Sequence, residues 1–422
     1  MKILKTAIVL SGLLLMIGCA EPARFQLNVV AHREAEQDQP FARQKVEDVA
    51  NVLTALFGTP DDPAFPNAKS LHWYLEYDEE YSVDLETLVR FENLQRAAGP
   101  VGTDEKGRSR GLYREHCAHC HGVTGGGAGP TAASLSPYPR DFRNGVFKFK
   151  STTGKSRPSD EDLMRILNEG VHGTAMPSFK VAISESEKRA LVDYIKYLSI
   201  RGEVELALWD FTANLDKEER LPLVFAKGYE QLNDDQKDEI LGWFESDGVR
   251  IESIFKSWIK AHKKPLIKKP TSPPARFAAD HADHYQMVDR GRELFHGKKL
   301  GACTQCHGDT GYGDGELGNF DIWNKWAKGK TAEKVAAYTS QGVLPPRNIR
   351  PRNFRNGVFR GGRSPTQLFY RIKNGIQGSE MPGAATLTDE EVWCLVAYVR
   401  SIKTESITGG QQSKPVINKP IH

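Results

Sequence analysis

The chain contains the sequence Cys117-Ala118-His119-Cys120-His121, and the same arrangement returns as Cys303-Thr304-Gln305-Cys306-His307. Both copies follow the pattern Cys-x-x-Cys-His. On a helix, residues three and four positions apart lie on one face. Each copy therefore predicts a short helix that presents two thiols and one imidazole to the same side.

An internal repeat surrounds the two motifs. The nine residues Pro-Arg-Asp-Phe-Arg-Asn-Gly-Val-Phe stand at 139–147, and Pro-Arg-Asn-Phe-Arg-Asn-Gly-Val-Phe stands at 351–359. A Met-Pro pair follows each copy, at Met176-Pro177 and at Met381-Pro382. Because the parts occur twice in the same order, the sequence predicts a duplicated domain.

The chemistry of Cys-x-x-Cys-His suits covalent attachment of haem c, with two thioether bonds to the macrocycle and one axial nitrogen. The alternatives are a disulfide or a zinc knuckle. Zinc needs four ligands brought together across a long separation, and it does not explain a histidine directly after each cysteine pair. The sequence therefore predicts two covalently bound haem c groups, with these attachment cysteines and iron-binding histidines: Cys117, Cys120, His121, Cys303, Cys306 and His307.

Length and composition limit the classes of protein that fit. The 422 residues suffice for two or three domains with hydrophobic cores. The 57 Lys and Arg against 54 Asp and Glu give a net charge of +3, and 39% of the residues are hydrophobic. This balance excludes a nucleic-acid binder defined by bulk charge and a protein with many membrane spans. No nucleic-acid partner is expected.

Both halves resemble class I c-type cytochromes, over about residues 105–202 and 282–403. The family's frame of a small residue, an aromatic residue and the first cysteine matches Ser109, Tyr113 and Cys117. In the second copy seven residues separate Phe295 from Cys303, which indicates an inserted turn or loop. The family's carboxy-terminal helix matches residues 184–198 and 388–402. The resemblance implies an all-α fold of two tandem class I cytochrome c domains with further helical segments.

The sixth iron ligand separates an electron carrier from a site that binds oxygen or peroxide. Met176 and Met381 each lie in a Gly-x-x-Met-Pro loop after a helix, where proline restricts the backbone beside the thioether. Met164 and Met287 lie inside expected helices and are interpreted as core or surface residues. Met176 and Met381 are therefore the predicted distal ligands, with iron held by His121, Met176, His307 and Met381. A filled pair of axial positions favours electron transfer.

Glycine-rich loops and arginines suggest further contacts to the haems. In the family, a proline-bearing loop after the motif gives a backbone carbonyl to the ligand histidine, and Pro130 fits this role whereas Glu316 does not. A carboxylate at 316 favours ferric iron, so the second haem is expected to have the lower potential. The arginines of the repeat are interpreted either as partners of haem propionates or as ordinary surface residues: Arg140, Arg143, Arg352 and Arg355.

The amino terminus has the pattern of an export signal. Lys2 and Lys5 precede an apolar run that ends at Gly18-Cys19. This pattern resembles a bacterial lipobox, so Cys19 is the predicted lipidation site, and a cleaved signal without lipid or an uncleaved anchor is the alternative. The protein is expected to be exported to the periplasm and anchored to the membrane by lipidated Cys19.

The expected organisation and function follow from these patterns. The boundaries are a signal peptide at 1–18, a helical extension at 19–104, a cytochrome c domain at 105–202, a helical insert with a Lys- and Pro-rich linker at 203–281, a second cytochrome c domain at 282–403 and a flexible tail at 404–422. The predicted protein is a non-enzymatic carrier of single electrons between redox partner proteins, or the cytochrome subunit of a larger membrane oxidoreductase. A di-haem peroxidase-like enzyme and a haem sensor are the other readings.

Overall fold

The structure is a computed structural model that describes residues 23–37, 39–66, 85–216, 221, 233–235, 251–297 and 303–405. The signal, Cys19 and nearly all of the expected tail lie outside these residues. The described chain is helical, with a single two-stranded antiparallel hairpin, and this confirms the all-α class. Among the described helices, none has the length and apolar composition needed to cross a bilayer.

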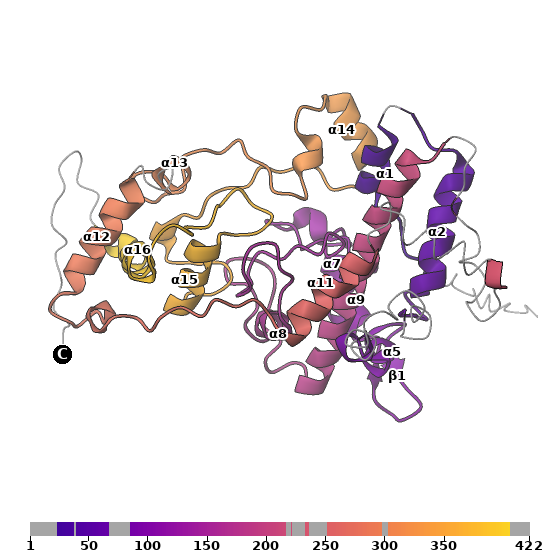
Figure 1. The fold of residues 1–422 in the computed structure, drawn as a ribbon, viewed down its shortest axis with the longest axis horizontal. Coiled ribbons are helices and arrows are strands. Elements are labelled where there is room, and N and C mark those ends of the chain that lie inside the picture. The colour runs from indigo at the N-terminus through magenta and orange to yellow at the C-terminus, as the bar shows by residue number, and fades with distance from the viewer. Residues whose placement is uncertain are drawn as a thin grey trace, which may run out of the picture.

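The elements follow one another along the chain as Figure 1 labels them. In the first half they are α1 (Val29–Glu36), α2 (Arg43–Phe57), α5 (Phe91–Ala97), β1 (Gly102–Thr103), β2 (Ser109–Arg110), α6 (Leu112–His116), α7 (Ala118–His121), η1 (Ala132–Ser134), α8 (Asp160–Glu169) and α9 (Glu185–Asn214). In the second half they are α11 (Ile251–Lys263), η4 (Ala275–Phe277), α12 (His284–His296), α13 (Cys303–His307), η6 (Lys325–Ala327), α14 (Ala332–Thr339), η7 (Phe354–Asn356), α15 (Pro365–Asn374), α16 (Asp389–Ser401) and η8 (Ile402–Thr404).

Equivalent helices of the two halves begin and end on the same local signals. Ser159 and Ser364 form capping boxes at the starts of α8 and α15, and Ser184 and Thr388 do so for α9 and α16. Each capping box satisfies backbone donors at a helix start. Glycines with positive φ follow the last residues of α8 and α15. These short-range signals explain why the expected helices at 160–169 and 388–402 are found almost as predicted.

The first core is larger than a cytochrome c domain of residues 105–202 alone. Helix α9 runs unbroken across the expected boundary at residue 202, and its buried side chains continue as far as Thr212. Trp209, beyond that boundary, stacks on the rings of His32 and Phe41 from the amino-terminal segment. The amino-terminal segment, the first motif, α9 and α11 therefore share one hydrophobic core. The extension and the described part of the insert are not separate units.

The second core is built on α12 and α16, which cross at Gly291. A Cβ at Gly291 would overlap the carbonyl oxygen of Cys394, so glycine permits the close approach of the two helices. Phe295 and Tyr398 meet beside this crossing, with ring centroids 5.4 Å apart. Cys394 is 3% exposed, so its thiol is buried in this core.

The first half forms an equivalent helix crossing. Ser109, the small residue of the family frame, lies in β2. Helix α5 packs on α9, and the β1–β2 hairpin separates α5 from the short helix α6 that leads to Cys117. Tyr113 still contacts Tyr194 of α9, at a centroid distance of 4.9 Å. Both halves therefore carry an interruption between the crossing helix and the cysteine motif.

Helices were expected at 44–57 and 84–96. The first is found as α2, whereas residues 85–88 form a helical turn that ends before α5 begins at Phe91. The expected linker after α11 is extended, and it lies against both halves. Leu266 accepts a hydrogen bond from the backbone of Thr153, and Thr271 accepts one from Trp393 Nε1.

Candidate haem-binding sites

Each cysteine motif forms the short helix that its spacing predicts, as α7 and α13. The cysteines of each pair are not joined in a disulfide. Burial raises the pKa of the Cys117 thiol to about 12, and burial also raises the pKa of Cys303 and Cys306. These environments disfavour a thiolate and suit a neutral sulfur, as in a thioether.

Both predicted ligand histidines are oriented by a backbone carbonyl. His121 Nδ1 donates to the carbonyl oxygen of Arg140 at 2.9 Å, and His307 Nδ1 donates to that of Arg352 at 3.2 Å. Because a carbonyl only accepts, Nδ1 carries the proton and Nε2 keeps its lone pair. Burial lowers the pKa of His121 to about 4 and lowers that of His307. Each imidazole is therefore held neutral, with Nε2 available to a metal.

The source of this carbonyl corrects the expectation drawn from Pro130. The carbonyl comes from the arginine that follows Pro139 or Pro351, inside the repeated nine-residue segment, and so both copies provide it. The loop at Pro130 instead binds the cysteine helix through the next residue, because proline has no N–H. Thr131 N donates to His119 O at 3.0 Å, whereas Glu316 N itself donates to Gln305 O at 2.8 Å.

The same repeated segment also supplies an aromatic face to each histidine. Phe142 stacks on His121 with ring centroids 4.7 Å apart, and Phe354 stacks on His307 at 4.4 Å. One short segment thus fixes each imidazole by a hydrogen bond and by a flat apolar neighbour. Each copy of the segment therefore has the same structural role, which is to orient the histidine of its own domain.

The glycines after each motif have a packing role, beyond that of simple turn formers. A Cβ at Gly127 would lie 2.7 Å from Pro139 O, and one at Gly313 would lie 2.5 Å from Pro351 O. Both residues have positive φ, 74° and 73°. Glycine therefore lets the loop that follows each histidine approach the repeated segment that orients it.

The methionine loops have the same hydrogen bonds in both halves. Val171 N donates to Met176 O at 3.1 Å, and Met176 N donates to Thr174 Oγ1 at 3.1 Å. In the second loop Ile376 N donates to Met381 O at 3.1 Å, and Met381 N donates to Ser379 Oγ at 3.3 Å. The two methionine loops therefore have equivalent sequences and equivalent backbone hydrogen bonds.

The structure gathers the predicted residues of the second half around one cavity of about 1750 Å³. Its lining includes Cys303, Cys306, His307 and Met381, and it extends to residues of the first half such as Arg140. In the first half Cys117 belongs to the hydrophobic core, and the partly buried Met176 packs against that core. There the ring of His116, next to Cys117, lies 6.0 Å from Phe179 of the methionine loop.

The arginines of the repeat divide into two kinds. Arg143 donates to both carboxylate oxygens of Asp141, at 2.9 and 2.8 Å, and Arg355 donates to backbone carbonyls such as Thr310 O at 2.8 Å. These two are therefore structural and not candidates for propionate binding. Arg140 and Arg352 line the cavity, as the carboxylate-paired Arg143 also does.

The cavity arginines fit an anionic group. Within the described residues, the buried Nε atoms of Arg352 and Arg360 have no hydrogen-bond partner. Burial lowers the pKa of Arg140 to about 10, against the Coulombic effects of Asp321 and Asp141, and burial also lowers the pKa of Arg352 and Arg360. Partly desolvated guanidinium groups of this kind suit the carboxylates of haem propionates.

Several cavity residues were not singled out from the sequence. They lie in residues 317–349, which we call the insertion, and they include Asp321 and Trp323. A length difference was the available signal: Gly129 and Pro139 are ten residues apart, whereas the equivalent Gly315 and Pro351 are 36 apart. Lys148 of the first half, which pairs with Asp321 at 2.9 Å, was also missed.

Comparisons with known proteins show which sequences and structures resemble this chain. Residues 105–195 match the family model of cytochrome c oxidase, cbb3-type, subunit III, and residues 288–403 match that of cytochrome c. Cytochrome c55X of Paracoccus denitrificans is 33% identical over 101 residues, which cover 23% of this chain and 79% of that protein. A solved structure of the Kuenenia stuttgartiensis reducing HAO-like protein complex has a TM-score of 0.43 and 24% identity, over 72% of this chain and 98% of that one.

The described domains are helical, and each has paired cysteines and a neutral histidine, with a cationic cavity beside them. These features are typical of haem-binding electron-transfer domains. The chain belongs to the c-type cytochromes, with two cytochrome c domains in tandem, and its cofactor is haem c.

Proposed function

We propose that this chain is a di-haem electron carrier, exported and tethered to a membrane, that transfers single electrons between two redox partner proteins. Each haem is attached through one cysteine pair and ligated by one histidine and one methionine. The observation that carries the proposal is the equivalence of the two sites: each has a neutral histidine held by an arginine carbonyl and a methionine held in the same loop.

A haem bound here supplies the one-electron Fe(III)/Fe(II) couple. The chain's own residues exclude other ligands and set the electrostatic surroundings. Met176 and Met381 would supply the second iron ligand at each haem, and a soft sulfur ligand favours the ferrous state. Arg140 and Arg352 add positive charge, which stabilises the state with the lower iron charge. These features favour reversible electron transfer over substrate binding at iron.

The first test is the haem count and the response to ligand removal. Pyridine haemochrome analysis should give two haems per chain, and a count of one would contradict the duplicated site. Met176→Ala and Met381→Ala should each open one haem to carbon monoxide, measured by the ferrous absorption spectrum. Met164→Ala is the matched control, because Met164 lies in α8 against the same core and should leave both haems closed. Ready binding of carbon monoxide by the unmodified protein would favour the peroxidase-like reading.

The membrane tether is tested separately. The motif ending at Cys19 supports lipidation, and two or three acyl chains hold a protein firmly where one holds it weakly. Cys19→Ser should release the protein from washed membranes, or block its processing. Normal processing with unchanged membrane retention would contradict a lipid anchor.

A role as the cytochrome subunit of a larger oxidoreductase is the second candidate. The description of the family model over residues 105–195, a subunit of an oxidase, favours it. Purification from membranes in mild detergent distinguishes the two roles. A stable complex with a catalytic subunit supports the second candidate, whereas a monodisperse free cytochrome supports a mobile carrier.

A further inference from the structure

The two cytochrome domains touch through reciprocal contacts. A Cβ at Gly173, in the first methionine loop, would lie 2.8 Å from Val358 Cγ1 in the second repeated segment. A Cβ at the equivalent Gly378, in the second methionine loop, would lie 2.9 Å from Val146 Cγ1 in the first repeated segment. Each methionine loop therefore packs on the histidine-orienting segment of the other domain, as in a two-fold symmetric interface.

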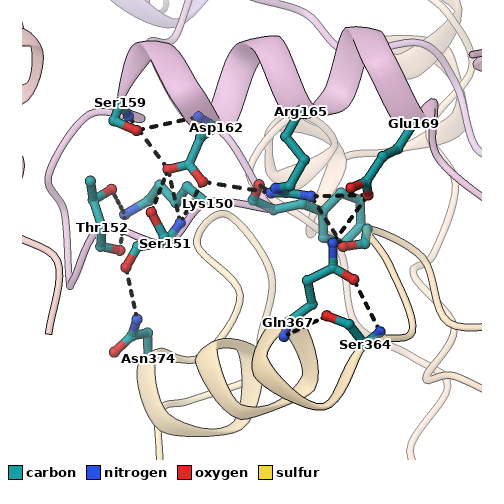
Figure 2. A network of polar contacts seen from close by, with 12 residues as sticks. Lys150, Ser151, Thr152, Ser159, Asp162, Arg165, Glu169, Ser364, Gln367 and Asn374 are labelled. Carbon is teal, nitrogen blue, oxygen red and sulfur yellow. Dashed lines mark hydrogen bonds and ion pairs between the residues drawn. The ribbon is translucent and has the colours of Figure 1, made fainter. Parts of the chain in front are cut away.

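On a two-fold axis, a residue of one domain contacts the same position of the other domain, and the structure contains such contacts. A Cβ at Gly361 would overlap the ring of Phe149, its own counterpart in the repeat. The equivalent helices α8 and α15 also face each other, as Figure 2 shows. Gln367 Nε2 donates to Glu169 Oε2 at 3.1 Å, and Asn374 Nδ2 donates to Ser151 O at 3.4 Å. The domain pair is thus arranged like a homodimer within one chain.

The insertion breaks this symmetry, because the first domain has only a short loop in its place. Lys148 of the first domain pairs with Asp321, and Arg347 donates to Leu135 O at 2.6 Å and to Ala133 O at 3.0 Å. Between these points, Tyr338 of α14 donates to Glu34 Oε1 of α1 at 2.6 Å. The insertion therefore holds the first domain at several separate points.

Trp323 of the insertion contacts both haem sites. Its ring lies under the guanidinium of Arg140, with Cζ 3.4 Å from the ring centroid, and its Nε1 donates to Asp141 O at 3.1 Å. On its other side, a Cβ at Gly378 would lie 2.7 Å from Trp323 Cη2. One side chain thus spans from the arginine that orients His121 to the loop that carries Met381.

The opposite pairing lacks this aromatic residue. Arg352, which orients His307, approaches the first methionine loop directly, since its Nη1 would lie 3.7 Å from a Cβ at Gly173. Arg352 therefore faces the first methionine loop directly, whereas Trp323 lies between Arg140 and the second methionine loop.

We propose that Trp323 is a positioning residue that couples the two haem sites into one fixed electron-transfer pair. This inference rests on the proposed function. The aromatic face excludes water from Arg140, so the positive charge of Arg140 acts on the first haem site through a medium of low dielectric. The same ring packs against the second methionine loop and would hold that loop in a fixed position against the first domain.

The test compares three variants of the full holoprotein. Trp323→Leu keeps the space filled by apolar atoms but removes the aromatic face and the N–H donor. Trp323→Phe restores the face without the donor. Phe320→Leu is the matched control, because Phe320 is an aromatic residue of the same insertion that does not line the cavity. Each variant is measured for haem content, for the midpoint potentials of both haems and for the rate of electron redistribution between haems after a one-electron pulse.

We expect Trp323→Leu to lower the midpoint of the first haem and to slow redistribution, with two haems still bound. Trp323→Phe should restore most of both properties, and Phe320→Leu should leave them near the values of the unmodified protein. Unchanged midpoint and rate in Trp323→Leu would overturn the inference, as would equal changes in Phe320→Leu. If the unmodified protein exchanges no electrons with mediators at either haem, the proposed function itself fails instead.

Discussion

Glu316 lies on the surface beside the second cysteine motif. Together with burial, its charge raises the pKa of Cys306. A carboxylate near a haem favours ferric iron and lowers the potential. Because Glu316 is exposed, a dielectric near that of water applies, and Coulomb's law over about 10 Å gives about 0.4 kcal/mol, or about 20 mV for one electron.

Glu316→Gln should therefore raise the midpoint of the second haem by this small amount in a redox titration. Glu333→Gln, an exposed residue of α14, is the control and should change neither midpoint. A midpoint for the second haem that does not move would show that the difference between the haems comes from the arginines and Trp323, and not from residue 316.

Glu203 is a buried carboxyl on α9 whose pKa departs strongly from its ordinary value. Burial raises its pKa to about 7, although Arg157 and a hydrogen bond from Trp258 Nε1 at 2.7 Å oppose the shift. The folded protein therefore keeps the proton at pH values where the unfolded chain, with a pKa near 4.5, has lost it. Stability must fall as the pH rises from about 4.5 to about 7.

Glu203→Gln should remove this part of the pH dependence. Relative to the variant, the unmodified protein should lose up to about 3 kcal/mol of unfolding free energy across that range. Denaturant unfolding of both proteins at pH 4.5, 5.5 and 7.5 measures the difference. The raised pKa would be contradicted if the unfolding free energies of the unmodified protein and of Glu203→Gln changed equally with pH.

At the scale of elements, the crossing of α12 and α16 tolerates no side chain at Gly291, because a Cβ there would overlap Cys394 O. Gly291→Ala should destabilise the second domain by about 1–3 kcal/mol, as overpacked core sites do. Thermal unfolding measured by circular dichroism checks this. Gly318→Ala is the control, since nothing lies within 4 Å of the added atom, and equal stability of the two variants would show that the helices move apart freely.

Helix α9 shows how an element extends a domain beyond its motifs. Its capped start at Ser184 and its first turns match the helix expected at 184–198. The remaining turns bury Val204, Leu208 and Trp209 against the amino-terminal helices. The boundary at residue 202 followed the length of the family's helix, whereas the real helix continues because distant segments cover its apolar face.

At the scale of the whole molecule, the ion pair between Lys148 and Asp321 joins the two domains, and both side chains are largely buried. Burial lowers the pKa of Lys148 to about 8, and Arg140 contributes to the shift. Asp321→Asn leaves a buried cation next to another cation. This change should weaken domain docking by about 3 kcal/mol, as removal of one partner from a buried pair does.

Limited proteolysis of the linker between α11 and α12, together with small-angle scattering, measures this docking. Asp321→Asn should increase cleavage, and the double variant Lys148→Met with Asp321→Asn should recover part of the loss. Cleavage at the rate of the unmodified protein in the single variant would show that the Arg347 contacts and the network between α8 and α15 suffice to hold the domains together.

The structure that depends on residues close together in the chain could be predicted from the sequence alone. The spacing of the cysteines and histidines, the repeated segments, the Gly-x-x-Met-Pro loops and the capping residues act over fewer than ten positions, and they predicted the tandem cytochrome domains and most helix bounds. The candidate ligands Met176 and Met381 lie in loops whose hydrogen bonds are equally local. Fold class and family are confirmed, and the ligand assignments stay predictions.

Contacts between distant segments were decided only by the tertiary structure. The carbonyl that orients His307 comes from Arg352, 45 residues away, and no local pattern distinguishes that donor from the loop at Glu316. The same is true of Trp323, whose neighbours Arg140 and Gly378 belong to two different domains. Periodicity and capping record interactions within a few residues, whereas the side-chain packing that joins two domains depends on the shape and burial of both surfaces at once.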